Sequence, residues 1–454
     1  MRRWKRRTRW LPSAFFFAVC AAPATLAQSN TVSFARDIAP ILARKCITCH
    51  GPEKAKGNYR VDSFALLTKT GGSKSAPITP GQPQAGELWR RLTATDADDR
   101  MPQKDDPLPA PQLALIERWL REGATFDGPD KTLPLNSFIQ RVPHAAAPAA
   151  YPQPIPLTAL ALSSEGKLIA ASGYHEVTLW NSGDLKLSCR IGGLPERIRA
   201  LAWQPHGELL AVAGGSPGLA GEVSLVRLGQ AGPPRLLASS PDMMLAVNFS
   251  PDGHRLAAGG SDNSIHVFDV ESGREELLIQ QHADWIVSVA FSPDKARLAS
   301  ASRDRTARVF DSKTGELETT FADHAAPVLA IAWLEDGKRI ATAGRDKKIQ
   351  FWNAKDGKKS GESIAVEDEI LQLVVAGPRL VTAGADRIIR LYNLQDRSLV
   401  RAFAPHDDIV YSLAFDPGSG RLLSGSHDGE LRVWNSNSGE LLKKIFASPG
   451  LSPQ

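Results

Sequence analysis

The feature that most constrains the fold of this chain is a repeat that occupies its C-terminal two thirds. An aromatic residue followed by a polar one recurs at spacings of 46, 42, 42, 42, 40 and 42 residues, with one degenerate copy. The seven pairs are Trp180-Asn181, Val226-Arg227 (degenerate), Phe268-Asp269, Phe310-Asp311, Trp352-Asn353, Tyr392-Asn393 and Trp434-Asn435. A period of about 40–45 residues is typical of a four-stranded unit that packs against copies of itself.

Each repeat contains short segments of alternating hydrophobicity separated by turn residues, as in IVSVAFSPD, RLASAS, ARVFD and ELETTFA. This alternation predicts four half-buried strands in every repeat. Seven such units can close on themselves and leave few exposed sheet edges. We therefore expect residues 155–448 to form an all-β, seven-bladed radial array.

The repeats resemble WD-repeat β-propellers, in which His, Ser or Thr, Asp and Trp of one blade form a buried hydrogen-bonded set. The fifth and seventh repeats supply all four residues: His324, Thr342, Asp346 and Trp352, then His406, Ser424, Asp428 and Trp434. The fourth repeat supplies His282, Ser300 and Asp304 with Phe310 in place of Trp, whereas the first, second and sixth depart from the pattern. Buried polar groups are costly unless they are paired, so we interpret these histidines and aspartates as structural rather than catalytic or metal-binding.

Ahead of the repeats, residues Cys46 to His50 form a C-x-x-C-H motif, which indicates covalent attachment of a c-type haem. Two thiols at this spacing match the two vinyl groups of one haem, and the following His50 can reach the iron from the same side. A thioredoxin-like pair would need a βαβ context, and a zinc site would use four ligands. The remaining cysteines, Cys20 and Cys189, form no second pair. The motif therefore favours one covalent haem c, attached through Cys46 and Cys49.

The second axial ligand of such a haem is best sought among the few methionines. Met101 lies in the segment DDRMPQK, where the following proline restricts the backbone and directs the thioether. Met243 and Met244 fall at the start of a predicted strand, where packing is the simpler role. His144, between the helical region and the repeats, is an alternative ligand. We predict ligation by His50 and Met101.

Helical periodicity flanks the motif on both sides. Ser33 is placed to cap a helix through 34–42 that delivers Cys46 at its end, with Pro40 marking its regular start or a kink. A last helix is predicted from Pro111 to Gly123, with Trp119 on its apolar face. Two terminal helices that pack beside a haem are typical of small all-α cytochromes c, so we expect Trp119 in their core.

Residues 32–124 also resemble the planctomycete-type cytochrome c domain, a family found fused to propellers and other modules. The matching segments are FARDIAPIL (34–42), CITCHGP (46–52), YRVDS (59–63), GG (71–72), PG (80–81), ELWRRL (87–92), RMP (100–102) and ERWLREGA (117–124). The resemblance implies a single haem with His50 and Met101 as axial ligands. It implies little about redox partners.

The N-terminus reads as an export signal. Residues 1–27 hold six cations and no acidic residue, then an apolar stretch around 14–22 and small residues that place cleavage after Ala27. A membrane anchor is the alternative, but the apolar run falls short of the ~20 residues that a bilayer requires. A lipid-modified Cys20 is disfavoured because Val19 precedes it. Removing this segment changes the formal net charge from +5 to −1, which gives no basis for a nucleic-acid partner.

These features predict a multidomain protein: a signal peptide (1–27), an all-α c-type cytochrome domain (31–126), a Pro/Ala-rich linker (127–154) and a propeller (155–448). We expect a periplasmic or otherwise extracytoplasmic protein without a transmembrane span in its mature chain. With both axial positions filled by protein, electron transfer to a partner docked on the propeller is the leading hypothesis. A haem oxidoreductase and a redox sensor or scaffold are the alternatives, and an electron carrier is favoured over a catalyst.

Overall fold

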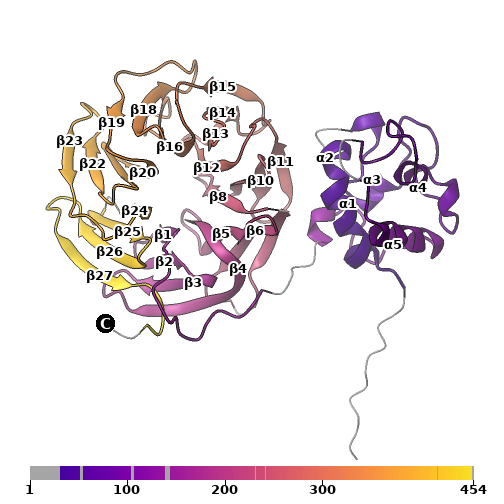
Figure 1. The fold of residues 1–454 in the computed structure, drawn as a ribbon, viewed down its shortest axis with the longest axis horizontal. Coiled ribbons are helices and arrows are strands. Elements are labelled where there is room, and N and C mark those ends of the chain that lie inside the picture. Colours follow the sequence, from indigo (N-terminus) through magenta and orange to yellow (C-terminus); the bar gives the residue numbers. More distant parts are fainter. Residues whose placement is uncertain are drawn as a thin grey trace, which may run out of the picture.

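The computed structural model describes residues 31–51, 55–103, 107–138, 144–230, 232–240, 242–416 and 418–451. The predicted signal peptide, its cleavage site and Cys20 lie outside these residues. Figure 1 shows a small helical region followed by a large β region whose sheets are arranged in a ring.

The helical region begins as the sequence predicts. The side chain of Ser33 accepts a hydrogen bond from the backbone N–H of Arg36 at 3.0 Å, and the first helical turns follow. Pro40 lies in the first turn of α1, where regular helix starts. The elements are η1 (Phe34–Ile38), α1 (Ala39–Lys45), α2 (Ile47–His50), η2 (Lys56–Asn58), α3 (Phe64–Leu67), η3 (Pro83–Ala85), α4 (Glu87–Leu92), α5 (Ala110–Arg121) and η4 (Leu135–Phe138).

The first and last helices of this region share one aromatic core. The rings of Phe34 and Trp119 lie 5.5 Å apart, and both side chains are fully buried. The indole N–H of Trp119 donates to the carbonyl of Thr125 at 3.0 Å, so Trp119 is the core residue that the periodicity predicts. Leu135 and Phe138 also belong to this core. The helical core therefore extends beyond residue 127, where the sequence placed the start of the linker, because these two apolar side chains find a buried site there.

Within the described residues, the β region has six sheets. The strands are β1 (Leu160–Leu162), β2 (Leu168–Ser172), β3 (Tyr174–Asn181), β4 (Leu187–Trp203), β5 (Leu209–Ser216), β6 (Ala220–Arg227), β7 (Arg235–Ser240), β8 (Met244–Phe249), β9 (Arg255–Gly260), β10 (Ile265–Asp269), β11 (Glu275–Ile279), β12 (Ile286–Phe291), β13 (Arg297–Ser302), β14 (Ala307–Asp311), β15 (Leu317–Phe321), β16 (Val328–Trp333), β17 (Arg339–Gly344), β18 (Lys348–Asn353), β19 (Ile364–Ala365), β20 (Ile370–Ala376), β21 (Arg379–Gly384), β22 (Arg390–Asn393), β23 (Leu399–Ala402), β24 (Val410–Asp416), β25 (Arg421–Ser426), β26 (Glu430–Asn435) and β27 (Leu441–Phe446).

Five sheets have four antiparallel strands each, and the remaining sheet has seven, β1 to β7. The sequence predicted seven separate sheets. The difference lies in the long strand β4, whose first part pairs with β3 and whose end pairs with β5. Arg197 pairs with both Tyr174 and Gly215, so the chain stays extended between the first two repeats and joins them into one sheet.

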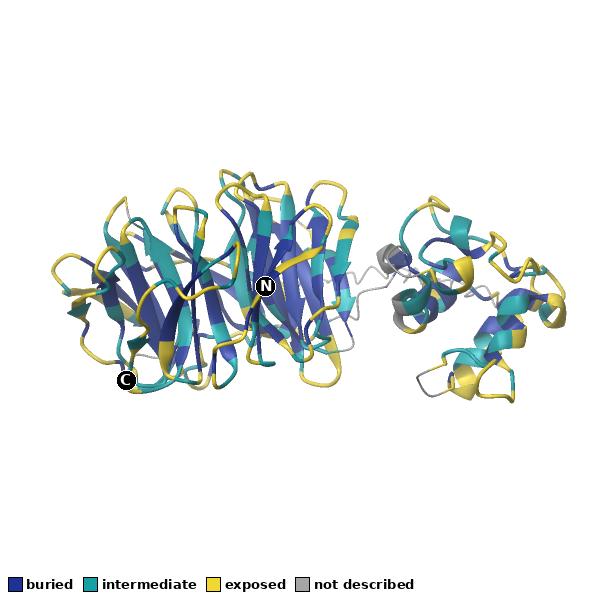
Figure 2. Cartoon of the chain, turned by 90° about the horizontal axis from the view of Figure 1, so that it is seen from above, coloured by how far each residue is buried: buried dark blue, intermediate teal, exposed yellow. Residues whose placement is uncertain are grey.

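The innermost strands of the repeats, β1, β4, β8, β12, β16, β20 and β24, line a central channel of about 580 Å³. The first and last sheets are neighbours in this ring, and hydrogen bonds join them. The N–H of Leu157 donates to the carbonyl of Ser426 at 3.0 Å, and the hydroxyl of Ser412 donates to the carbonyl of Leu157 at 2.9 Å. Figure 2 shows buried residues along the strands and exposed residues at the loops of both faces.

Residues 144–151, which the sequence assigned to the linker, pack on the first sheet. The phenol of Tyr151 donates to the carboxylate of Glu176 at 2.7 Å, and the imidazole of His144 lies 2.9 Å from the carboxylate of Glu222. The Arg190 guanidinium donates to the carbonyl of Ala149 at 2.7 Å. The segment is therefore held against the first sheet by the side chains of His144 and Tyr151 and by the carbonyl of Ala149. His144 contacts the β region and is not available as a haem ligand.

Candidate cofactor-binding site

The two motif cysteines and His50 lie on one short helical bend. Cys46 ends α1, and its N–H donates to the carbonyl of Leu42 at 2.9 Å. The following turn, α2, carries Cys49 and His50, whose N–H donates to the carbonyl of Cys46 at 2.9 Å. The C-x-x-C spacing in this helical turn places Cys46 and Cys49 one turn apart, with His50 directly after Cys49. Both thiols are free and partly exposed.

His50 is oriented by a hydrogen bond to the backbone. Its Nδ1 lies 3.0 Å from the carbonyl oxygen of Tyr59, which can only accept, so Nδ1 carries the proton and donates. The Nε2 atom then keeps its lone pair for an external Lewis acid. The N–H of Val61 donates to the carbonyl of His50 at 2.8 Å, and the phenol of Tyr59 donates to the carbonyl of Leu67 at 2.7 Å. Hydrogen bonds of this kind fix the orientation of metal-binding histidines.

Cys46, His50 and Met101 line one cavity of about 370 Å³ in the helical region. This cavity falls in the size range of small-molecule and cofactor sites, ~300–1,000 Å³. Its walls combine apolar side chains with Gly71 and Gly72, where a Cβ atom would lie 2.8 Å from Tyr59 and 2.7 Å from the backbone of Gly57. Three of the four residues that the sequence predicts as a haem site are thus brought together, and Cys49 lies one helical turn from Cys46.

Helix α4 positions Met101. The N–H of Met101 donates to the carbonyl of Arg91 at 2.9 Å, and the Arg91 guanidinium donates to the carboxylate of Asp99 at 2.6 Å. Arg91 and Arg90 both bind Glu87, one turn earlier, and the hydrogen bond from Arg90 lowers the pKa of Glu87 to about 2. The loop that bears Met101 is therefore attached to a helix by one backbone bond and a network of ion pairs.

The protonation state of Cys46 disfavours the competing chemistries. Burial, with a contribution from Cys49, raises the pKa of the Cys46 thiol to about 12. A reactive dithiol catalyst needs the opposite shift, because the thiolate is the nucleophile. Cys46, Cys49 and His50 also do not converge into a three-ligand metal group within the described chain. Among the described residues the zinc interpretation therefore has no geometric basis, and the raised pKa of Cys46 gives no support to the thioredoxin-like interpretation.

The residues present fit a c-type haem. They supply two thiols on one helical turn, an imidazole with a free Nε2, and a thioether on another wall of the same cavity. The motif identified Cys46, Cys49 and His50, and the Met-Pro segment identified Met101. The orienting roles of Tyr59 and Arg91 instead depend on backbone carbonyls. No side-chain pattern in the sequence signals a carbonyl acceptor, so sequence reasoning missed both roles.

The predicted polar sets of the repeats form to different extents. In the fifth repeat, His324 lies 2.8 Å from Asp346 and 2.9 Å from Thr342, and Trp352 donates to Thr342 at 3.2 Å. The fourth repeat makes the same contacts from His282 to Asp304 and Ser300, both at 2.7 Å, without an indole. The set is a structural network in both repeats, as predicted.

The seventh repeat corrects the prediction of a complete set. His406 and Trp434 bind Ser424 at 2.7 and 2.8 Å, but Nδ1 of His406 and Oδ2 of Asp428 have no hydrogen-bond partner in the described structure. Asp428 instead accepts from the N–H of Glu430 at 2.8 Å and from the Ser426 hydroxyl. Asp428, His406 and Glu430 keep polar atoms within 4.8 Å of one another, but no hydrogen bond joins Asp428 to His406 in the described structure.

The third repeat contains a histidine that sequence reasoning did not single out. His266, on β10, lies 2.6 Å from Glu275 and 3.0 Å from Asp262. Burial opposes its charge, but the two carboxylates raise the pKa of His266 to about 10. The imidazolium is therefore a structural cation at neutral pH. A histidine in the middle of a strand gave no signal of this role.

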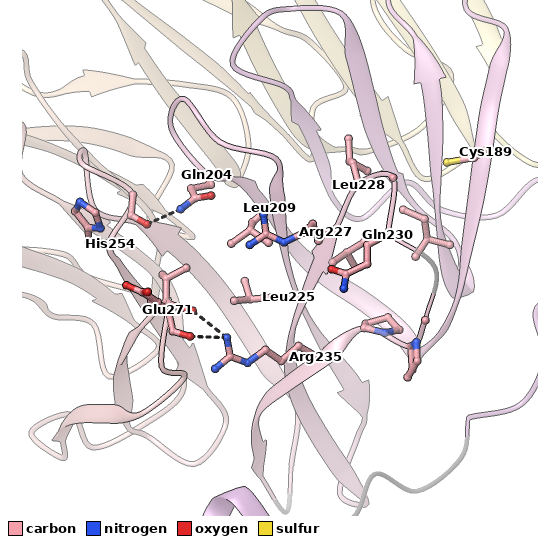
Figure 3. Close-up of a pocket in the computed structure, with 18 residues that line it drawn as sticks. Cys189, Gln204, Leu209, Leu225, Arg227, Leu228, Gln230, Arg235, His254 and Glu271 are labelled. Carbon is pink, nitrogen blue, oxygen red and sulfur yellow. Dashed lines mark hydrogen bonds between the residues drawn. The ribbon is translucent and has the colours of Figure 1, made fainter.

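A larger cavity of about 1,020 Å³ lies at the outer edge of the second and third repeats (Figure 3). Arg235 closes one side by donating to the carbonyl of Glu271 at 2.8 Å, and Gln204 donates to Gly253 at 2.9 Å. Cys189 is exposed at its rim, apart from the other cysteines. Met243 and Met244 are buried in the β region, which confirms their predicted packing role.

The fold and the site define a class of protein: a cytochrome c-like helical domain joined to a β-repeat scaffold. More specifically, the chain carries a planctomycete cytochrome c domain fused to WD40 repeats. The family model Planctomycete cytochrome C matches residues 46–105. The model WD domain, G-beta repeat matches residues 237–269, 274–311, 315–353 and 397–435, which end at the aromatic pairs of repeats three, four, five and seven.

Two curated proteins of Arabidopsis thaliana share short segments with the chain. The WD repeat-containing protein VIP3 is 37% identical over 97 residues, which are 19% of this chain and 29% of that protein. The U3 snoRNP-associated protein-like EMB2271 is 40% identical over 53 residues, 12% of this chain and 11% of that protein. The chain thus spans less than a third of the length of either relative. In the described part of the chain, none of the helices has the length and apolar character needed to cross a bilayer.

Proposed function

We propose that this protein is an exported c-type cytochrome with one covalent haem, which transfers electrons to or from a partner docked on a seven-bladed propeller. The observation that carries the proposal is the shared cavity of Cys46, His50 and Met101. WD repeats favour a protein-interaction role for the β region. The basic and apolar segment 1–27 supports export to an extracytoplasmic compartment. We expect this segment to be removed by cleavage after Ala27.

Haem, when bound, supplies a one-electron redox centre at this cavity. The Cys46 and Cys49 thiols would hold it through two thioether bonds, and His50 Nε2 and the Met101 thioether would bind its iron. The carbonyl of Tyr59 keeps the His50 proton on Nδ1, and α4 holds Met101 through the Arg91 carbonyl. Methionine–histidine ligation raises the reduction potential of a haem, and two protein ligands leave no open site for a substrate. These features favour electron transfer over catalysis.

We infer that β4 serves two blades, which makes the six sheets equivalent to seven repeats. Seven inner strands around one channel support this count. We assign the domains as in the sequence: cytochrome (31–126), linker (127–154) and propeller (155–448), with the linker folded onto its neighbours at both ends. The propeller then offers rigid loops at two faces for a redox partner.

Haem content tests the proposal directly. The full chain is produced in a host that matures c-type cytochromes and is assayed by denaturing-gel haem staining and by pyridine haemochrome absorbance. We expect one haem per chain that survives denaturation and is lost in Cys46→Ala and Cys49→Ala. Cys189→Ala is the matched control and should retain it. Protein that matures without bound haem would overturn the proposal.

The ligand assignment has its own test in a matched pair of variants. Met101→Leu removes the sulfur but keeps the side-chain volume, whereas Met243→Leu makes the same change in the β region. We expect Met101→Leu to lower the reduction potential and to open the ferrous haem to carbon monoxide, with Met243→Leu unchanged. An unaltered potential and absorption spectrum in Met101→Leu would contradict ligation by Met101.

A further inference from the structure

The charges of the helical region are divided between its two halves. Residues 44–81, which contain the C-x-x-C-H motif, hold seven cations and two acidic residues, a formal net charge of +5. Residues 82–127, which contain Met101, hold six cations and nine acidic residues, a formal net charge of −3. The cavity that His50 and Met101 share is lined by residues of both halves. The helical region therefore has a strong charge asymmetry across this cavity.

One wall of the cavity carries lysines without ion partners. Lys56 lines the cavity, and Lys74 directly follows Ser73, which lines it too. The N–H of Gly72 donates to the carbonyl of Gly57 at 2.6 Å, so the two segments that bear these lysines form one wall. Lys74 is exposed and Lys56 is half-buried, and neither has an ion pair among the described residues. This lysine wall, made by residues 56–59 and 71–75, presents two positive charges at the cavity.

The charges of the α4 side of the cavity are neutralised within the region itself. Arg90 and Arg91 both bind the carboxylate of Glu87, at 2.8 and 2.9 Å. The carboxylate of Asp99 binds the same two arginines, at 3.4 and 2.6 Å. The acidic residues of the loop 96–98 are exposed but do not line the cavity. The unpaired charge on the described cavity wall is therefore positive.

We propose that the lysine wall is the docking surface for an acidic patch of the redox partner protein. This inference rests on the proposed function, because it takes haem to occupy the cavity. Opposite charges on two proteins raise their rate of association and orient them before contact. The acidic loop 96–98 adds to this orientation, since it repels an acidic patch that approaches from the other side. A partner held by the β region then meets the helical region with its acidic face.

Oxidation of the ferrous holoprotein tests the sign of the charge at the cavity. Stopped-flow rates are measured with hexacyanoferrate(III), a trianion, and with tris(phenanthroline)cobalt(III), a trication, each of which accepts one electron from the haem. We expect the rate constant of the anion to fall by about tenfold as the ionic strength rises from about 10 to about 500 mM, whereas that of the cation rises. A chain without haem would contradict the proposed function. The same salt dependence for both oxidants in haem-containing protein would overturn this inference alone.

A glutamate peptide tests whether the surface is suited to a protein. Decaglutamate should inhibit oxidation by hexacyanoferrate(III) at least about tenfold better than free glutamate at the same carboxylate concentration, because its linked charges bind the lysine wall together. Equal inhibition by the peptide and by free glutamate would indicate a site for small anions and would overturn the docking of an acidic protein.

Substitutions locate the effect on the lysine wall. The double variant Lys56→Gln, Lys74→Gln should lower the rate constant of the anion by about tenfold at low salt and should lose the inhibition by decaglutamate. Lys74→Gln alone changes only an exposed side chain and should show part of both losses. The matched control is the double variant Lys313→Gln, Lys355→Gln, which removes two exposed lysines of the β region without ion pairs in the described structure and should behave as the wild type.

Two results with these variants would overturn the proposal. One is an unchanged rate constant and salt dependence in the double variant of the lysine wall. The other is a shifted reduction potential with unchanged inhibition by decaglutamate, which would show that the two lysines act on the cofactor rather than on a partner.

Discussion

The fifth repeat allows a hydrogen-bond chain to be tested by one substitution. Trp352 donates to Thr342, whose hydroxyl donates to Nε2 of His324, while Nδ1 of His324 donates to Asp346. Thr342 and Trp352 are fully buried, and His324 is nearly so. Thr342→Val keeps the shape of the side chain but removes the oxygen that links the indole to the imidazole.

Two buried groups then lose their partner: the Trp352 N–H and His324 Nε2. A buried donor or acceptor without a partner costs about 1–3 kcal/mol, so the loss of two partners in Thr342→Val should reduce the free energy of unfolding by about 2–6 kcal/mol. Urea unfolding followed by tryptophan fluorescence measures the loss. Thr382→Val is the matched control, because Thr382 has the same register in the sixth repeat and is buried without a side-chain hydrogen bond in the described structure.

We expect Thr382→Val to change the free energy of unfolding by less than about 1 kcal/mol, because it leaves no buried group without its hydrogen-bond partner. A small effect of Thr342→Val would refute the view that this set holds the turns of its repeat. Equal losses in the two variants would show that the cost arises from the β-strand position rather than from the hydrogen bonds.

Two further predictions concern His266 and the cavity wall. The native state keeps the His266 proton until about pH 10, whereas the unfolded chain releases it near pH 6.5. The contribution of protonated His266 to the free energy of unfolding is therefore complete below pH 6.5 and is lost as the pH rises to about 10. Unfolding free energy should fall by up to about 1.4 kcal/mol per pH unit in that window, and His266→Gln should remove this slope in urea titrations at several pH values. Gly72→Ala places a Cβ atom 2.7 Å from the Gly57 carbonyl and should lower both the thermal midpoint and the yield of haem-containing protein. Gly192→Ala, where nothing lies within 4 Å, should change neither, and an equal effect of both substitutions would contradict the role of this wall.

Local signals predicted the helical site well because each depends on neighbours in sequence. Pro40 marks the start of α1, and Cys46 to His50 occupy one turn, as periodicity and spacing indicated. The repeat period likewise located the inner strands, since every repeat uses the same alternation. The planctomycete-type resemblance and the WD-repeat resemblance both agree with the family models.

The features that sequence reasoning missed depend on contacts between distant backbone groups. The extended path of β4 follows from the pairing of Arg197 with two strands, which no local pattern reveals. Leu135 and Phe138 read as linker because their periodicity is short, yet they fill a core made by other elements. In the seventh repeat all four expected residues are present, but local bonds of Asp428 to Ser426 and Glu430 decide where its carboxylate lies.

The junction between the first and last sheets sets the order in which this molecule can mature. The carbonyl of Leu157 accepts its hydrogen bond from the hydroxyl of Ser412, a residue that lies 255 positions later in the chain. Contacts of such long range form late, because the entropy of closing the intervening loop must first be overcome. A nascent chain therefore emerges with its helical part and early sheets able to form, while the ring stays open until the final sheet arrives.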